Sequence, residues 1–362
     1  MGKIMIKGNK EGTAFKMFIA GMVLFLYVLL GLVEINIEDD LRVKEVSSSL
    51  IVATDIKAKK SFIKWVDFKV TYEALQKAYE YDISTYGKEI HLDFIELLAY
   101  AGAKHGGVFD EKALKTIDKL ADELINKEIT IESITQDMQY YAYYLEAYSA
   151  VLKEYVGEYR IEVTDENGNA SYKECYGLRC FHPIAYGFPY SDYDDFGASR
   201  SYGYKRVHLG HDMMGQTGTP IIAIESGVVE ALGWNQYGGW RIGIRSYDGL
   251  RYYYYAHMRK DRPYALNLKQ GDEVIAGDVI GYMGHTGYSV EENVNNIEVT
   301  HLHMGIQLIF DESQKDGNGE IWIDCYALTK FLYKNRSRVV RDDSTKEWYR
   351  ETAVEIPFIP KK

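Results

Sequence analysis

Thr300-His301-Leu302-His303 and the upstream segment His208-Leu209-Gly210-His211-Asp212 carry the strongest structural signal in this chain of 362 residues. In an extended strand, side chains two positions apart point to the same face. We therefore expect His301 and His303 to lie side by side in one groove. Alternation along the upstream segment places its first, third and fifth residues on one face and turns His211 away.

The residue types in these two segments suit a metal site. Two imidazoles and a carboxylate that meet in a groove form the donor set of a catalytic zinc, with the fourth position left to water. Six of the nine histidines fall between positions 208 and 303, which supports a clustered site. A single HxH pair would be weak evidence, because histidines two positions apart also occur on ordinary strands. His211 stays open as an alternative ligand through its HxxH spacing with His208.

Several motifs follow one another in a fixed order and resemble a known family. They are His208-x3-Asp212, Gly218-Thr219-Pro220, Ser226-Gly227-Val228-Val229, Tyr255-Ala256-His257, Gly271-Asp272-Glu273-Val274, Gly277-Asp278-Val279-Ile280-Gly281 and His301-x-His303. As a set they resemble the lysostaphin-like zinc endopeptidases of family M23, which cut peptidoglycan peptides. The resemblance covers residues 188–310, about a third of the chain.

The resemblance implies a fold, a cofactor and a site. The expected chain is α+β, with a mainly antiparallel-β zinc peptidase domain that has an open groove. One Zn²⁺ per chain is expected on His208, Asp212 and His303. His301 and His257 stand at the family's catalytic positions. We assign His301 to the attacking water and His257 to the tetrahedral intermediate, and the reverse assignment stays open.

The chain departs from the family pattern between Gly287 and His301. Residues 288–300 form an acidic insertion that contains Glu291, Glu292 and Glu298. A loop of this length beside the active site is expected to shape one wall of the groove and to place negative charge there. That charge would favour a substrate peptide with a free or bridging amine. The alternative is a solvated loop that touches nothing, and a preference for glycine bridges is not implied.

Composition narrows the classes of partner and compartment. The formal net charge of −11 argues against nucleic acid, because binding phosphates requires clustered Lys and Arg. Hydrophobic residues make up 46% of the chain, enough to bury one or two cores. Cys175 and Cys180 can close a small disulfide loop in an oxidising compartment, and three reduced thiols are an equal alternative. Cys325 is expected to be buried.

The amino-terminal part contains a candidate membrane anchor. Residues 17–33, MFIAGMVLFLYVLLGLV, contain no charged residue and are long enough for a short membrane span. Lysines outnumber acidic residues in positions 1–16, whereas acidic residues follow Val33. The positive-inside rule therefore predicts a cytoplasmic tail at 1–16, a single-pass signal anchor at 17–33, and the rest of the chain outside the cell membrane. No A-x-A cleavage site follows, which argues against a secreted form.

The next part of the chain changes from irregular to helical. Residues 34–65 are predicted to form a stalk, and residues 66–158 a small helical domain of about four helices. Asp110 is placed to cap one helix, and Gly106-Gly107 to end another. The last helix is predicted from Met138 to Tyr155, where apolar residues step by three and four, with termination at Gly157.

The sequence indicates the helices of this domain more clearly than it indicates their function. Some related cell-wall enzymes carry a lysozyme-like helical domain in which a glutamate acts as general acid. Glu96 is the only tempting candidate, and it lacks a recognisable partner carboxylate. A spacer, or a docking site for a protein partner, explains the domain better.

The remaining segments are predicted as follows. Residues 159–185 are a β-prone connector with a hairpin turn at 166–169, and residues 186–330 are the peptidase domain. Asp248-Gly249 predicts a second hairpin turn inside the peptidase domain. Residues 331–362 are expected to form a peripheral charged tail.

Two functions of different classes fit these observations. The first is a membrane-anchored zinc endopeptidase that acts on peptidoglycan peptides outside the membrane. The alternative is a non-catalytic membrane-anchored scaffold, which would activate cell-wall hydrolases or form part of a sporulation channel. The five motif positions are intact, which favours the enzyme.

Overall fold

The computed structural model describes residues 62–357, apart from residues 203 and 318. Within this part of the chain, no helix is long and apolar enough to span a membrane. The predicted anchor at residues 17–33, the tail before it and most of the predicted stalk lie outside the described residues.

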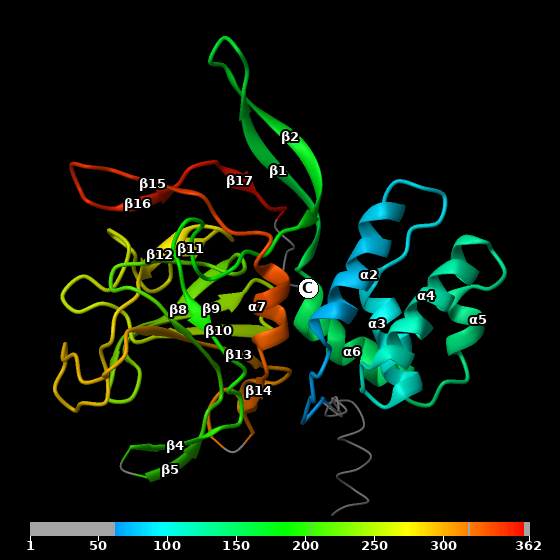
Figure 1. The fold of residues 1–362 in the computed structure, drawn as a ribbon, viewed down its shortest axis with the longest axis horizontal. Helices are drawn as coiled ribbons and strands as arrows, with labels where there is room; N and C mark the ends of the chain where they lie inside the picture. Colours follow the sequence, from blue (N-terminus) through cyan, green and yellow to red (C-terminus); the bar gives the residue numbers. More distant parts are fainter. Residues whose placement is uncertain (1–61, 203, 318, 358–362) are drawn as a thin grey trace, which may run out of the picture. The chain divides into compact units, whose positions relative to one another are not determined.

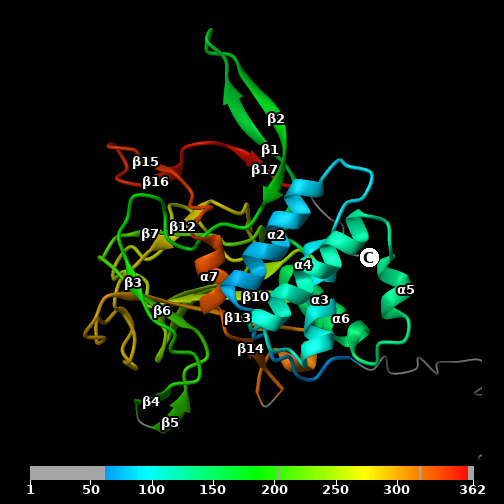
Figure 2. The ribbon, with the colours of Figure 1, turned by 45° about the vertical axis from the view of Figure 1, so that its right-hand side comes forward.

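Helices occupy the first part of the described chain (Figures 1 and 2). They are α2 (Tyr72–Thr85), α3 (Phe94–His105), α4 (Glu111–Ile125), the short α5 (Ile131–Thr135) and α6 (Tyr141–Leu152). The predicted caps are present. The Asp110 side chain accepts from two backbone amides of the first turn of α4, and Gly106 ends α3 in the left-handed region with φ of 62°. These capping residues determine where the helices, and the apolar faces that they carry, begin and end.

The last helix is shorter than the sequence predicts. α6 begins at Tyr141 and ends at Leu152, and Gly157 lies inside a strand, so the predicted termination at Gly157 is wrong. Tyr155 is fully buried, but its amide bonds the carbonyl of Leu152 in a turn beyond the helix. Apolar residues therefore continue at helical spacing as far as Tyr155 because the chain stays buried there, although the helix itself has ended at Leu152.

A two-stranded antiparallel ribbon follows the helices. It consists of β1 (Val156–Thr164) and β2 (Ala170–Leu178), joined by the predicted turn, with Gly168 at φ of 84°. The short strand β17 (Val354–Glu355) pairs with β1 as a third strand. Cys175, Cys180 and Cys325 are all free thiols, and Cys180 and Cys325 are buried.

The second half of the described chain is mainly antiparallel β-structure, as predicted. A sheet has the order β11-β8-β9-β10-β13-β6-β3, with β14 also paired to β13. Its strands are β3 (Ser191–Asp192), β6 (His211–Met214), β8 (Gly227–Asn235), β9 (Gly239–Ser246), β10 (Arg251–Ala256), β11 (Glu273–Val274), β13 (His301–Leu308) and β14 (Ile321–Ile323). The predicted Asp248-Gly249 turn joins β9 and β10, with Gly249 at φ of 78°.

Three smaller pairs and two short helices surround this sheet. The pairs are β4 (Ser199–Tyr202) with β5 (Tyr204–Val207), β7 (Pro220–Ile222) with β12 (Val279–Tyr282), and β15 (Val339–Arg341) with β16 (Trp348–Arg350). The helices are the 3-10 turn η1 (Glu312–Gln314) and α7 (Tyr326–Leu332), which packs against α2.

Alternation along β13 separates the core from the site, as the HxH pattern predicts. Leu302 and Met304 are fully buried on one face. The side chains of His301 and His303 lie on the other face and are 13% and 16% exposed. The strand thus contributes to the hydrophobic core and to a solvent-open surface at the same time.

Arg251 is fully buried at the start of β10 and links the sheet to the helices. Its Nη1 donates to the carbonyl of Ala150 in α6 at 2.7 Å, and its Nε and Nη2 donate to the two oxygens of Glu225 at 2.7 and 3.0 Å. Asp248 accepts a further bond at 2.9 Å, and the Tyr253 hydroxyl donates to Glu225 at 2.6 Å. Every charge in this cluster is therefore paired and hydrogen-bonded.

Residues 331–357 pack against the part of the chain that contains the sheets, so the expectation of a peripheral tail at residues 331–362 is wrong for the described part of that range. Arg336 donates to backbone carbonyls of the segment before β3. Glu347 is only 2% exposed and accepts bonds from Arg262 and from the Tyr282 hydroxyl. The charges in this segment suggested exposure, but several of them are satisfied inside the fold.

Replacing Arg251 should strongly destabilise the protein. Arg251→Met would leave the Glu225 carboxylate buried without its cation, which typically costs about 3–5 kcal/mol. Arg160→Met is the matched control, because the exposed pair of Arg160 with Glu355 is worth roughly 0–1 kcal/mol. Chemical denaturation of both variants measures the difference, and equal losses in free energy of unfolding would contradict this role for Arg251.

Candidate metal centre

His208 lies in the connection between β5 and β6 and not in a strand. β6 begins only at His211, so the predicted extended conformation of residues 208–210 is wrong. Two backbone bonds hold this connection instead. The His208 amide donates to the carbonyl of Ala198 at 2.9 Å, and the His208 carbonyl accepts from the amide of Gly197 at 2.8 Å. The side chain still reaches the groove, because the connection folds it back toward Asp212.

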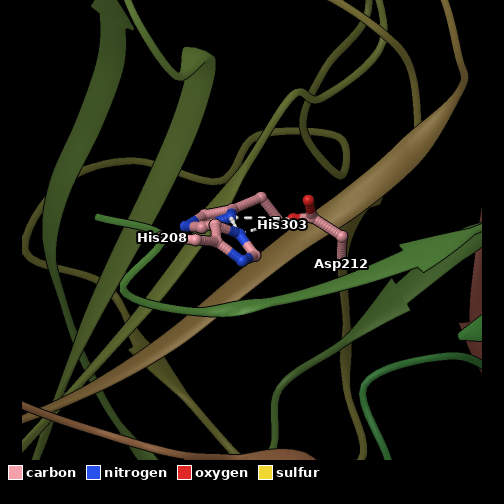
Figure 3. Close-up of side chains that lie close together, drawn as sticks. All are labelled: His208, Asp212 and His303. Carbon is pink, nitrogen blue, oxygen red and sulfur yellow. Dashed lines mark hydrogen bonds and ion pairs between the residues drawn. The ribbon is translucent and has the colours of Figure 1, made fainter. Parts of the chain in front are cut away.

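Three side chains converge at one point (Figure 3). His208 Nε2 lies 3.0 Å from Asp212 Oδ1 and 2.9 Å from His303 Nδ1, and His303 Nδ1 lies 2.9 Å from the same carboxylate oxygen. Asp212 on β6 and His303 on β13 are directly opposed in the strand register. His208, Asp212 and His303 form the one group of metal-ligand type found among the described residues.

Gly210 makes the close approach of these side chains possible. A Cβ atom at this position would lie 2.5 Å from Cε1 and 2.7 Å from Nε2 of His303, and 2.7 Å from the carbonyl oxygen of Met304. Such distances are far inside van der Waals contact. Only glycine therefore allows the connection to pass over the HxH strand.

The hydrogen bonds of His208 indicate what lies between the three side chains. Its Nδ1 is 3.1 Å from both the carbonyl oxygen and a carboxylate oxygen of Asp195, which are acceptors. The proton of a neutral ring is therefore on Nδ1, and Nε2 presents a lone pair. That lone pair faces the carboxylate of Asp212 and a nitrogen of His303. A cation at this point satisfies all three atoms together, so the donor set fits zinc.

The protonation equilibria of this cluster agree with a ligand set. Burial alone would raise the pKa of Asp212, but bonds from His208 and His303 hold it well below its ordinary value. Burial lowers the pKa of His303, although Asp212 opposes this effect. Burial also lowers the pKa of His208, but Asp212 and Asp195 outweigh it and the pKa is raised. A proton on His208 would thus compete with a metal ion for the same position.

His211 points away from this cluster, as alternation predicts. Its side chain is 1% exposed, its Nε2 lies 2.9 Å from Asp192, and its ring packs against Tyr326. The HxxH alternative is therefore not assembled in the structure.

His301 and His257 flank the cluster, and the Nδ1 atom of each ring lies within hydrogen-bond distance of a backbone carbonyl. His301 Nδ1 lies 2.7 Å from the carbonyl of Val299, and His257 Nδ1 lies 2.9 Å from the carbonyl of Thr286. Carbonyl acceptors place the proton on Nδ1 in both rings, which leaves each Nε2 free. The two ring centroids are 4.7 Å apart, and His301 Nε2 is 3.8 Å from Asp212 Oδ1. His257 adopts the left-handed region with φ of 61°, and burial holds its pKa well below the ordinary value.

These side chains line a cleft of about 500 Å³. Three glycines allow aromatic side chains of the cleft to pack closely against the backbone. A Cβ on Gly243 would meet the Tyr252 hydroxyl at 1.9 Å, one on Gly238 would meet the Tyr254 hydroxyl at 2.2 Å, and one on Gly305 would meet the Trp322 ring at 2.8 Å. Beyond the histidines and Asp212, the cleft is lined mainly by Arg200, Arg206, Tyr237, Arg241, Tyr252, Tyr254, Tyr288 and Trp322. None of these eight residues was predicted individually from the sequence to belong to the site, although the alternation of Arg241 with the buried Ile242 could have placed Arg241 on the groove face.

The acidic insertion contributes less to the cleft than expected. Among the described residues that line the cleft, Tyr288 is the only one from residues 288–300, so the glutamates do not line it. Asn293 anchors the loop by accepting from the Trp240 indole at 2.8 Å and donating to Asp261 at 2.7 Å. His285 is a turn residue that bonds the carbonyl of Ile297.

Metal analysis of the full chain should separate ligands from neighbours. His303→Ala and Asp212→Ala should lose most of a complement of one zinc per chain, because each removes one of three ligands. His211→Gln is the matched control and should keep the zinc. A full complement in both ligand variants, or loss of zinc only in the His211 variant, would contradict the assignment. Circular dichroism checks that each variant is folded.

The part of the chain that contains this site is similar to a known protein family. Residues 206–316 match the sequence model of peptidase family M23. The chain is 37% identical over 124 residues to the L-Ala–D-Glu endopeptidase of Bacillus subtilis, covering 34% of this chain and 36% of that protein. It is 40% identical over 90 residues to lysostaphin of Staphylococcus staphylolyticus, covering 25% of this chain and 18% of that protein.

A third relative is the peptidoglycan DD-endopeptidase ShyC of Vibrio cholerae, with 30% identity over 140 residues, or 39% of this chain and 29% of that protein. The chain therefore spans about a third or less of the length of these relatives. The matched part contains His208, Asp212 and His303, together with His257 and His301, whereas α2 to α6 lie outside the family match.

Proposed function

We propose that the M23 peptidase domain at residues 206–316 makes this chain a zinc-dependent endopeptidase that hydrolyses peptide bonds of peptidoglycan stem or cross-bridge peptides. The observation that carries the proposal is the convergence of His208, Asp212 and His303 at the edge of an open cleft. Three relatives that match this part of the chain are named as endopeptidases or as lysostaphin, which supports a peptide substrate.

Peptide hydrolysis needs an electrophile, an activated water and a group that stabilises the developing negative charge. Zinc bound by His208, Asp212 and His303 would lower the pKa of water toward neutrality and polarise the scissile carbonyl. The protein supplies the rest. Asp195 fixes the tautomer of His208, and the ionised Asp212 offsets part of the positive charge of the metal.

Proton transfer falls to the two flanking histidines. His301 Nε2 is nearest to the ligand set, so we assign it to take the proton from the water. His257 lies beside it and is held by the carbonyl of Thr286 with its Nε2 free. The proton that His301 takes from the water, passed on to this nitrogen, would make it a donor that stabilises the oxyanion of the tetrahedral intermediate. The reverse division of roles uses the same two nitrogens.

The non-catalytic scaffold remains the alternative of a different class. A scaffold would not require an assembled ligand set, a free Nε2 on two flanking histidines and a cleft open to a peptide. All three features are present together. They favour the enzyme.

We also propose that the enzyme acts outside the cell membrane, anchored by residues 17–33. The support is the uncharged segment with lysines before it and acidic residues after it. Peptidoglycan lies on that side of the membrane, so the topology and the substrate agree. The packing of α6 on the Arg251 cluster would keep the helices attached to the peptidase domain as a docking site or spacer.

Substitution of the two flanking histidines should abolish activity without removing the metal. His301→Ala and His257→Ala should retain close to one zinc per chain and lose roughly 100-fold or more in turnover, as is typical for acid–base and oxyanion groups. Digestion of purified muropeptides, followed by chromatography, measures the rate. His105→Ala on α3 is the matched histidine control. A wild-type rate in either site variant would show that its role is wrong.

Protease protection should reveal the topology. In intact protoplasts, a tag on the amino terminus should resist added protease, while a tag on the carboxy terminus should be cut, because the lysines before residue 17 hold that end inside. Lysed protoplasts provide the control in which both tags are cut. A mature protein that begins after residue 33 would instead indicate a cleaved signal.

A further inference from the structure

Two arginines of the cleft, Arg206 and Arg241, have no acidic partner among the described residues. Other cleft cations are neutralised: Arg200 pairs with Asp195 and Asp212, and Lys315 pairs with Glu230. By contrast, the Nε atoms of Arg206 and Arg241 are buried and lack any hydrogen-bond partner. A buried guanidinium donor without an acceptor is costly, so a native structure that keeps two of them beside a binding cleft has a reason to do so.

Aromatic side chains hold the guanidinium group of Arg206 at the cleft. Arg206, on β5, lies over the rings of Tyr237 and Tyr288, at 5.5 and 5.1 Å from the centroids, and donates to the Tyr288 hydroxyl. These ring contacts orient the cation without neutralising it. Arg241, on β9, lies on the groove face of the sheet because the next residue, Ile242, is in the core.

The two arginines line the same cleft as the three candidate metal ligands. Tyr254 lines the cleft with them, and its ring centroid is 5.9 Å from that of His303. The Tyr288 ring is 6.0 Å from the His257 ring. A group bound at Arg206 or Arg241 would therefore belong to a residue of the substrate close to the scissile bond.

We propose that Arg206 and Arg241 form a carboxylate-binding subsite, so that the enzyme prefers peptides with a free carboxylate beside the bond that is cut. The inference rests on the proposed endopeptidase function and names its substrate class. A guanidinium donates two parallel bonds to a carboxylate, and a carboxamide cannot accept both. The preference is opposite to the amine-bearing substrate that the acidic insertion suggested, because the glutamates of that insertion do not line the cleft.

A matched pair of substrates tests the subsite. Two otherwise identical stem peptides would carry either a free glutamate carboxylate or the corresponding carboxamide, and kcat/KM would be measured for the zinc-loaded full chain. Charge-assisted bonds predict about a 10- to 100-fold preference for the carboxylate form. In the Arg206→Gln, Arg241→Gln double variant, the ratio should fall close to one. Arg241→Lys should keep part of the preference, because the charge remains without the fork.

The controls separate this inference from the function on which it rests. Arg160→Gln removes a cation that does not line the cleft and should leave the ratio unchanged. The rate on the carboxamide and the zinc content of each variant report whether the active site is intact. Equal cleavage of both peptides by the wild type would overturn the carboxylate subsite and leave the endopeptidase standing. Cleavage of neither peptide by the zinc-loaded protein would overturn the proposed function, and the subsite with it.

Discussion

The antiparallel pairing of β13 with β6 is the constraint on which the rest of the site depends. It sets His303 directly opposite Asp212, and in the same register it buries Leu302 against the core. A shift of one residue would turn both histidines of β13 inward and the apolar residues outward. The core therefore selects the register, and the register brings two of the three proposed metal ligands together. His208 completes the set because Gly210 lets its connection pass close to β13.

The cleft that begins at this strand pairing differs in chemical character from one end to the other. At one end, three lone-pair atoms face one another and suit a cation. Beyond it, aromatic side chains pack against glycines, and two arginines follow that have no acidic partner within residues 62–357 as described. The chain as a whole carries a net charge of −11, and Asp316 and Glu320 also line the cleft, so the positive charge of Arg206 and Arg241 is a local feature. Such local fields can select among substrates of a neutral or acidic protein.

Local signals in the sequence were sufficient for part of this description. Asp110 and Gly106 fix helix ends through their own side chain or backbone, and the HxH alternation is a property of any half-buried strand. Features that depend on distant contacts could not be predicted in this way. The sequence does not show that Arg251 pairs with Glu225 under α6, or that Glu347 is buried beside Arg262.

The candidate site likewise combines features that local sequence signals predict with features that depend on distant contacts. Asp212 and His303 meet through strand register, and alternation within each segment places both side chains on the groove face. His208 reaches them from an irregular connection, so alternation along a strand does not explain its position. The two arginines of the proposed subsite come from β5 and β9, and only the folded structure places both on one cleft. Residues 288–300 show the converse, because acidic residues near a site in sequence did not become part of its surface.

Anomalous diffraction from crystals of the zinc-treated protein, recorded on both sides of the zinc absorption edge, would show directly whether His208, Asp212 and His303 bind zinc. We expect one strong peak per chain, about 2.0–2.2 Å from His208 Nε2, His303 Nδ1 and an oxygen of Asp212. Both flanking histidines should remain unligated. A peak at His211 and Asp192, or no peak at the His208, Asp212 and His303 cluster, would contradict this ligand assignment.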